Sequence, residues 1–203
     1  MCFTPDLPEP GRIELIGGPM FSGKTTELLR RLICDASVKR RVLYINHTFD
    51  VRTVESYSTH NPLYKEQLGR LQTYDMSMVS CSNLPELTEV EEYDTIGIDE
   101  CQFFDNLDRV REYADNGKRV IAAGLVGDTN RRIFGHLAEL LPESEDYTSL
   151  SALCAKCAEV RRVTKASFTF RLIDSMNQVD VGGADKYLPV CRAHYLEPST
   201  NSH

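Results

Sequence analysis

A glycine-rich turn near the N-terminus constrains this chain more than any other feature. Residues 18–25 read GPMFSGKT and complete the phosphate-binding pattern G-x-x-x-x-G-K-[ST]. A predicted strand at 12–16 precedes the turn and a predicted helix at 25–39 follows it, which is the context that the pattern needs. There the backbone N–H groups and the helix N-terminus converge on a phosphate, Lys24 reaches its oxygens, and Thr25 offers a hydroxyl to Mg²⁺. The alternative, a chance glycine-rich turn, is disfavoured because strand, loop and helix all agree with the motif.

Length and charge limit the classes of protein that this chain can form. Its 203 residues are 41% hydrophobic, which suits one substantial α/β core with a small appended module better than two full domains. The 30 acidic residues outnumber the 23 basic ones, so the net charge is −7. This balance argues against a protein held on nucleic acid mainly by electrostatics, and it favours an enzyme of small molecules.

No segment has the pattern of a membrane span or a secretion signal. The apolar runs are shorter than the ~20 residues that cross a bilayer. Residues 1–6, MCFTPD, lack the basic and then hydrophobic order of a signal peptide. We therefore expect a cytoplasmic protein with no membrane partner.

Three of the seven cysteines cluster late in the chain. Cys154 and Cys157 form one C-x-x-C pair, and Cys191 is followed at the same spacing by His194. Two such pairs supply three thiolates and one imidazole, a closed tetrahedral set typical of structural Zn²⁺. The alternative is a redox C-x-x-C, which leaves Cys191 and His194 unexplained. Cys101 follows two acids that raise the pKa of a thiol, so we interpret it as a small core residue.

Apolar runs alternate with helical patterns along most of the chain. Beyond the first strand and helix, we expect strands at 42–45, 95–98 and 120–125, a weaker strand at 71–74, and helices near 84–89 and 107–116. Continuous apolar strands indicate a sheet that is buried on both faces. The fold class is therefore α/β, with a mostly parallel, doubly wound sheet.

The pattern changes near residue 150, where cysteine pairs and a β-rich segment at 160–173 begin. We divide the chain into a nucleotide-binding α/β domain at 1–149, a zinc-binding lobe at 150–196 and a flexible tail at 197–203.

A second chemical centre follows the strand at 95–98. Asp99 comes at the carboxyl end of this strand, the edge where open α/β sheets bind ligands, so it is a candidate to hold Mg²⁺. Glu100 would point into the same crevice and could take a proton from a hydroxyl. The alternative is a pair of solvated acids that cap a turn. Arg52 follows the second strand and either stabilises a transferring phosphoryl group or forms a surface ion pair.

Three segments together resemble the zinc-containing, cytosolic thymidine kinase family. They are the phosphate loop at 18–24, the run IDECQFF at 98–104 and the run GGADKYLPVCRAHY at 182–195. The resemblance extends from about residue 11 to residue 195, and the family admits His at the fourth metal position. It implies a P-loop core like that of the RecA-type ATPases, with a small zinc lobe that carries a lasso loop over the substrate.

The resemblance also implies the reaction, which is ATP-dependent phosphorylation of the 5′-hydroxyl of thymidine and deoxyuridine in deoxynucleotide salvage. It implies a homotetramer and feedback inhibition by dTTP. Glu100 would be the catalytic base, with Arg52 beside it. The residues that would bind ATP and Mg²⁺ are Gly18, Pro19, Met20, Phe21, Ser22, Gly23, Lys24, Thr25, Asp99 and Gln102. The residues that would bind the nucleoside are Met20, Phe103, Leu125, Phe134, Thr164, Val179, Val181, Gly182 and Tyr187. Core packing is an equally good reading of Leu125 and Phe134.

The lasso would run through residues 179–183, where glycines permit backbone groups to approach a pyrimidine edge. Cys157 and Cys191 would fasten the two feet of this excursion. The chain departs from the family after the fifth expected strand, because the aromatic residue expected near Thr129 is missing. This departure would leave one wall of the base pocket roomier or more polar.

Two other function classes remain at this stage. One is a P-loop ATPase that acts on nucleic acid, with the zinc lobe as a clamp. It is the weaker reading because the chain lacks a second motor domain and a basic face. The other is a non-catalytic zinc-binding interaction module, which leaves both phosphate-site motifs unused.

Overall fold

The computed structural model describes residues 10–49, 76–172, 183 and 185–197. The predicted site residues Arg52, Val179, Val181 and Gly182 lie outside these residues, as do the expected strand at 71–74 and most of the tail.

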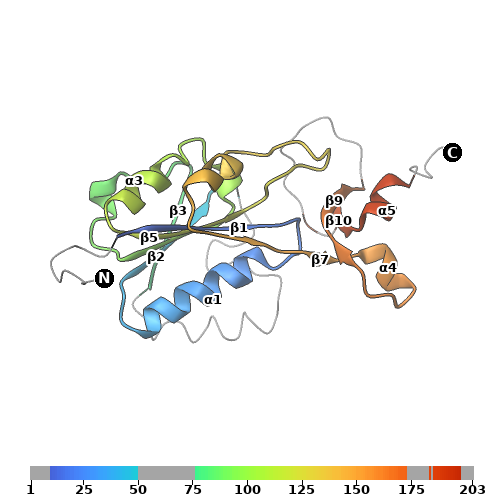
Figure 1. Cartoon of the computed structure of the whole chain (residues 1–203), viewed down its shortest axis with the longest axis horizontal. Coiled ribbons are helices and arrows are strands. Elements are labelled where there is room, and N and C mark those ends of the chain that lie inside the picture. Colours follow the sequence, from blue (N-terminus) through green and yellow to red (C-terminus); the bar gives the residue numbers. More distant parts are fainter. Residues whose placement is uncertain (1–9, 50–75, 173–182, 184, 198–203) are drawn as a thin grey trace, which may run out of the picture.

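A parallel six-stranded sheet forms the centre of the molecule, in the order β3-β2-β4-β5-β1-β6 (Figure 1). This confirms the predicted α/β fold with a parallel, doubly wound sheet. The strands are β1 Arg12–Gly17, β2 Val42–His47, β3 Met76–Cys81, β4 Thr95–Ile98, β5 Arg119–Gly124 and β6 Asp146–Ser149. Strands β3 and β6 lie at the two edges and were not predicted.

Helices cover both faces of the sheet. Helix α1, Lys24–Ser37, lies on one face and helix α3, Arg109–Asp115, on the other (Figure 1). Side chains of β1 alternate between them, since Leu15 packs toward α3 and Ile16 toward α1. Short 3₁₀ helices connect the larger elements at Leu87–Glu89, Cys101–Phe103 and Leu137–Glu143.

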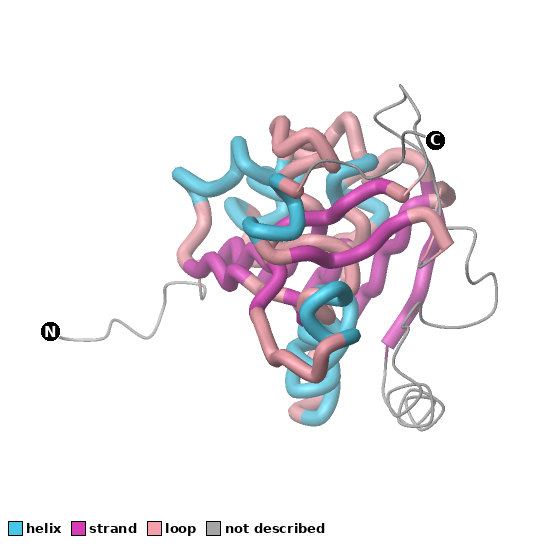
Figure 2. The backbone as a smooth tube through the Cα atoms, turned by 90° about the vertical axis from the view of Figure 1, so that its right-hand side faces the viewer, coloured by secondary structure: helices cyan, strands magenta, loops and turns pink. Residues whose placement is uncertain are grey.

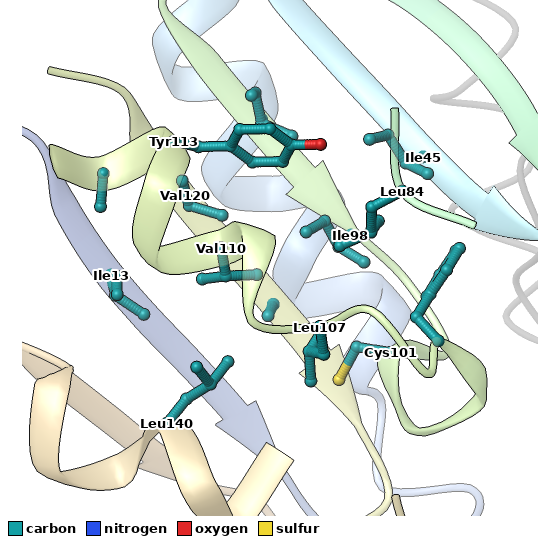
Figure 3. Packing of buried hydrophobic residues seen from close by; sticks show 14 of the residues in the cluster. Ile13, Ile45, Leu84, Ile98, Cys101, Leu107, Val110, Tyr113, Val120 and Leu140 are labelled. Carbon is teal, nitrogen blue, oxygen red and sulfur yellow. The ribbon is translucent and has the colours of Figure 1, made fainter. Parts of the chain in front are cut away.

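The α3 side of the core is densely packed (Figure 3). Val110 and Tyr113 of α3 lie over Ile13, Val120 and Ile98, and all five side chains are almost completely buried. Burial of this kind contributes roughly 1.5–3 kcal/mol for each large apolar side chain, so the sheet derives its stability from this packing.

A buried ion network ties α1 to the strands. Glu14 of β1 is 2% exposed, and its carboxylate accepts hydrogen bonds from Arg31 (2.7 Å) and Arg119 (2.8 Å). Burial alone raises the pKa of Glu14, but the hydrogen bonds from the two arginines outweigh it and lower the pKa below the usual value. Asp35 of α1 joins the network by accepting a hydrogen bond from Arg119 at 2.5 Å, and it also accepts one from the Thr95 hydroxyl at 2.6 Å.

The C-terminal lobe continues directly from β6 and lies at the carboxyl end of β1 (Figure 1). It contains two antiparallel pairs, β7 with β8 and β9 with β10, which Figure 2 shows from the lobe's side. Its elements are β7 Ala152–Leu153, α4 Ala155–Glu159, β8 Lys165–Ala166, β9 Phe168–Arg171, β10 Tyr187–Val190 and α5 Arg192–Leu196.

Several expected boundaries were wrong. The helix expected near 84–89 is a single 3₁₀ turn at Leu87–Glu89. The β-rich segment expected from 160 begins only at Lys165, because a turn at 160–161 and an irregular stretch at 162–164 follow α4. Helix α3 is shorter than expected and starts at Arg109. Among the described residues, no helix is long and apolar enough to cross a membrane.

Candidate active site

The phosphate loop joins β1 to α1, as predicted. Phe21 and Gly23 have positive φ angles of 63° and 85°, which turn the backbone tightly before α1 begins. A Cβ on Gly18 would lie 2.6 Å from Ser22 Oγ and 2.8 Å from the carbonyl oxygen of Leu150, so this position requires glycine. The turn thus presents the helix N-terminus to a bound anion.

Two hydrogen bonds hold the phosphate loop in place. The Lys24 ammonium donates a hydrogen bond to the carbonyl oxygen of Pro19 at 2.9 Å, which folds the side chain back across the loop. The backbone N–H of Met20 donates to Thr169 Oγ1 of β9 at 3.0 Å. The second contact joins the loop to the C-terminal lobe, so the two regions meet at the phosphate site.

Asp99 follows β4 and is 1% exposed. Its carboxylate accepts hydrogen bonds from the Tyr44 hydroxyl (2.9 Å), the backbone N–H of Glu100 (3.0 Å) and the Thr25 hydroxyl. Burial, and then the charge of Glu100, raise the pKa of Asp99 to about 7 despite these hydrogen bonds. The carboxylate is thus poised for a cation, and it already touches the hydroxyl that the sequence assigned to Mg²⁺.

Glu100 has a left-handed backbone with φ 50°, a conformation that costs energy for a non-glycine residue. Its side chain is held by Gln102, whose amide donates to Glu100 Oε2 at 2.7 Å. The other end of the same amide accepts from the backbone N–H of Leu125 at 2.9 Å. A Cβ on Gly124 would lie 2.6 Å from Gln102 Oε1, so glycine at the end of β5 makes room for this bridge.

Four aromatic side chains, which we call the aromatic group, lie beside the Gln102 bridge: His47, Phe49, Phe103 and Phe134. Phe103 packs against Phe134 with ring centroids 5.7 Å apart, and it also contacts Phe49 and His47 at 5.7 and 5.5 Å. Burial lowers the pKa of His47, and its Nδ1 accepts a hydrogen bond from the N–H of Phe49 at 3.0 Å. The sequence analysis missed His47. Its position at the carboxyl end of β2, next to β4 in the sheet, is the signal that could have found it.

The other residues predicted to bind the nucleoside lie in two regions. Two lie near Gln102, and two lie in the C-terminal lobe. Leu125 and Phe134 lie around Gln102 and Phe103, as one pocket would require. Tyr187 is buried at the start of β10, with the Arg171 guanidinium 5.6 Å from its ring centre. The Thr164 side chain hydrogen-bonds to Cys157, one of the four residues of the Cys/His cluster.

Cys154, Cys157, Cys191 and His194 converge at the far end of the C-terminal lobe. Their ligand atoms all lie within 4.8 Å of one another. His194 Nδ1 is 3.3 Å from the sulfurs of Cys154 and Cys191 and 3.5 Å from that of Cys157. A tetrahedral zinc ion with ordinary bond lengths requires sulfur to nitrogen separations of about 3.6 Å. The residues present therefore fit Zn²⁺, and all three cysteines are free thiols.

The surroundings of the cluster also suit a metal. Burial raises the pKa of the Cys154 thiol, but the backbone N–H groups of Cys191 and Cys157 and the His194 ring outweigh it and bring the pKa to about 6. His194 Nε2 lies 3.7 Å from a carboxylate oxygen of Glu197, the outer partner that orients a ligating imidazole. The redox alternative accounts for neither Cys191 nor His194.

Cys101, which follows Asp99 and Glu100, is fully buried among the apolar residues of the α3 side (Figure 3). Burial, followed by the charges of Asp99 and Glu100, raises the pKa of its thiol well above the usual value. The interpretation as a core residue is confirmed.

Fold and site together define a P-loop nucleotide-binding enzyme whose C-terminal lobe carries a Cys/His cluster that fits zinc. The family model for thymidine kinase matches residues 11–195. The chain therefore belongs to the thymidine kinase family, as the sequence predicted, and it is a kinase that uses ATP.

Relatives from distant organisms agree with this assignment. A thymidine kinase of Amsacta moorei entomopoxvirus is 37% identical over 187 residues, which cover 90% of this chain and 97% of the relative. A thymidine kinase of Oryza sativa subsp. japonica is 39% identical over 200 residues, covering 93% and 67%. Thymidine kinase 1 of Dictyostelium discoideum is 36% identical over 192 residues, covering 91% and 78%.

Proposed function

We propose that this chain transfers the γ-phosphoryl group of ATP to the 5′-hydroxyl of thymidine, and of deoxyuridine, in deoxynucleotide salvage. The observation that carries the proposal is the meeting of three groups at one sheet edge. The Thr25 hydroxyl, from the phosphate loop, contacts the buried carboxylate of Asp99, and Glu100 follows directly. Family membership supplies the substrate, and this geometry supplies a place for phosphate, cation and base.

Each group has a distinct part in the reaction. Lys24 and the loop N–H groups would bind the β- and γ-phosphates, and Thr25 and Asp99 would hold Mg²⁺. The cation neutralises charge on the phosphates when it is bound. Glu100 accepts the proton of the 5′-hydroxyl as that oxygen attacks the γ-phosphorus. Gln102 keeps the Glu100 carboxylate oriented through its hydrogen bond to Oε2.

The nucleoside would lie on the aromatic group, between Phe103, Leu125 and Phe134, with Met20 at the phosphate side and Tyr187 and Thr164 supplied by the zinc lobe. Arg52 beside Glu100, and the lasso residues Val179, Val181 and Gly182, complete the proposed site. A backbone lasso would match the 4-carbonyl and N3–H of thymine, whereas cytosine presents the reverse pattern of donor and acceptor. Zn²⁺ on the four ligands would fix the feet of the lasso.

The proposal extends to regulation and assembly. We expect dTTP to inhibit, because it carries thymine and a triphosphate in one molecule and so spans both subsites. We also expect a cytoplasmic homotetramer without a nucleic-acid or membrane partner, and the net charge of −7 supports the absence of a nucleic-acid partner. Light scattering after gel filtration, with and without dTTP, tests the assembly.

One assay tests the reaction. ADP release is measured with ATP and Mg²⁺ in the presence of thymidine, deoxyuridine, deoxycytidine or single-stranded DNA. We expect stimulation by thymidine, a kcat/KM for deoxyuridine about tenfold lower, and a kcat/KM for deoxycytidine at least ~10³-fold lower. Single-stranded DNA should have no effect. Stimulation by DNA without stimulation by thymidine would favour the nucleic-acid ATPase, and equal use of deoxycytidine would indicate a broader deoxynucleoside kinase.

A further inference from the structure

Residues 126–134, which follow β5, form a hairpin that is braced by its own hydrogen bonds. Gly127 and Ile133 pair as an antiparallel bridge, and the N–H of Phe134 donates to the carbonyl of Val126 at 3.1 Å. Inside the turn, Asp128 Oδ1 accepts from the backbone N–H groups of Asn130 and Arg132, each at 2.8 Å. Because these bonds close within the segment, the hairpin will move as one body.

The base of the hairpin carries two residues of the proposed nucleoside pocket. Leu125 enters it with its N–H on Gln102, and Phe134 leaves it with its ring on Phe103. Gly135 follows with φ 63°, and a Cβ there would lie 2.3 Å from the carbonyl oxygen of Gln102. Any tilt of the hairpin therefore moves the side chains of Leu125 and Phe134 in the proposed pocket.

The tip of the hairpin rests on the zinc lobe. The Tyr195 hydroxyl donates a hydrogen bond to the carbonyl oxygen of Thr129 at 2.8 Å. The Arg131 guanidinium lies 4.7 Å from the centre of the Tyr195 ring, the geometry of a cation–π contact. The ring also contacts Phe168 and Phe170 of β9, with ring centroids 5.2 and 6.4 Å away. Tyr195 is next in sequence to the metal ligand His194, so the metal site fixes the helix that presents its hydroxyl.

We propose that Tyr195 is a positioning residue that sets the nucleoside pocket from the zinc lobe, by holding the 126–134 hairpin through Thr129 and Arg131. The inference rests on the proposed function, since it takes Leu125 and Phe134 as pocket residues. Thymidine affinity, rather than the chemical step or ATP binding, is the property that the contact controls.

Tyr195→Phe tests the proposal because it keeps the ring for Arg131 and Phe168 and removes only the hydroxyl. Loss of one net hydrogen bond predicts a rise of about fivefold in the KM for thymidine. The kcat, the KM for ATP and the zinc content should stay unchanged. Arg131→Asn removes the cation and keeps a residue that tolerates a positive φ. It should raise the same KM about twofold.

Tyr113→Phe is the matched control. The Tyr113 hydroxyl also donates to a backbone carbonyl, that of Pro85, on the α3 side of the sheet. This variant should lose stability and keep the thymidine KM of the unmodified chain. An active chain whose thymidine KM is the same with and without the Tyr195 hydroxyl would overturn the inference alone. An unmodified chain that does not phosphorylate thymidine would overturn the proposed function, and this inference with it.

Discussion

The sheet and the zinc lobe are stabilised in different ways. The two faces of the sheet are covered by continuous apolar clusters against α1 and α3. The lobe's own cluster has five buried members, and two of them, Cys154 and Cys157, belong to the cluster that could hold a metal ion. Apolar burial can therefore stabilise the sheet by itself, whereas we expect the lobe to depend on a bound ion. We therefore expect the sheet to support the phosphate chemistry. We expect a metal in the C-terminal lobe to set the shape of the region that binds the nucleoside.

Removing the metal should separate the two regions most strongly. Cys157→Ser, or chelation of zinc, is expected to cost the lobe on the order of 10 kcal/mol of binding energy that is also folding energy. Amide hydrogen exchange should show β9 and β10 losing protection while β1 and β5 keep theirs. Elemental analysis of the unmodified chain should find one Zn²⁺. Equal loss of protection in all four strands would break the comparison, and a metal-free chain with a Cys154–Cys157 disulfide would restore the redox alternative.

A cavity in the sheet core should have the opposite pattern. Leu32 of α1 is fully buried, and its methyl groups occupy the space that a Cβ on Gly97 of β4 would need. Leu32→Ala is expected to cost about 2–5 kcal/mol in urea unfolding, with zinc still bound at one equivalent. Release of zinc from the folded variant would show that the structure of the lobe depends on packing in the sheet.

The bridge at Gln102 lies on the sheet side of the site. Gln102→Met keeps the length of the side chain and removes both hydrogen bonds, which frees the Glu100 carboxylate and leaves the Leu125 N–H without its acceptor. We expect kcat for thymidine to fall about ten- to a hundredfold, since each lost partner costs ~1–3 kcal/mol. The zinc content should not change. Steady-state kinetics with an unaltered kcat would exclude Gln102 as the residue that orients Glu100.

The partly exposed ion pairs that Glu27 forms on α1 should contribute least. Hydrogen bonds from Arg30, and then from Arg31, lower the pKa of Glu27 from 4.5 to about 2. Because the pKa is lower in the folded chain, the stabilisation is fully present above the unfolded pKa and is lost as the pH falls from 4.5 toward 2. Glu27→Gln should thus cost less than ~1 kcal/mol at pH 7, and the difference should shrink between pH 5 and pH 3. A difference in urea unfolding that is constant with pH would point to packing instead.

Local patterns allowed much of the fold to be predicted. Strand β4 was predicted with its exact bounds, because a strand buried on both faces reads as a continuous apolar run. Strand β6 was missed because Asp146–Ser149 is polar and pairs only at the sheet edge with β1. The pairing that makes it a strand connects residues more than a hundred positions apart, and no local pattern records it.

The same distinction applies to the site. The phosphate loop and the Cys/His cluster could be predicted, because each depends on fixed spacings within short segments. The contacts of Gln102 with Leu125 and of Tyr195 with Thr129 could not. Each joins a side chain to a backbone group, over 23 and 66 residues respectively, and a backbone group leaves no signature in the sequence.

The role of Glu100 as the base at the edge of the sheet can be tested by the substitution Glu100→Gln. The substitution keeps the shape of the side chain and abolishes its basicity. Thymidine binding by titration calorimetry should remain within about twofold of the unmodified chain, while kcat falls at least ~10²-fold, because the lost interaction belongs to the transition state. A variant that binds thymidine and turns it over at a nearly normal kcat would show that Glu100 is not the base.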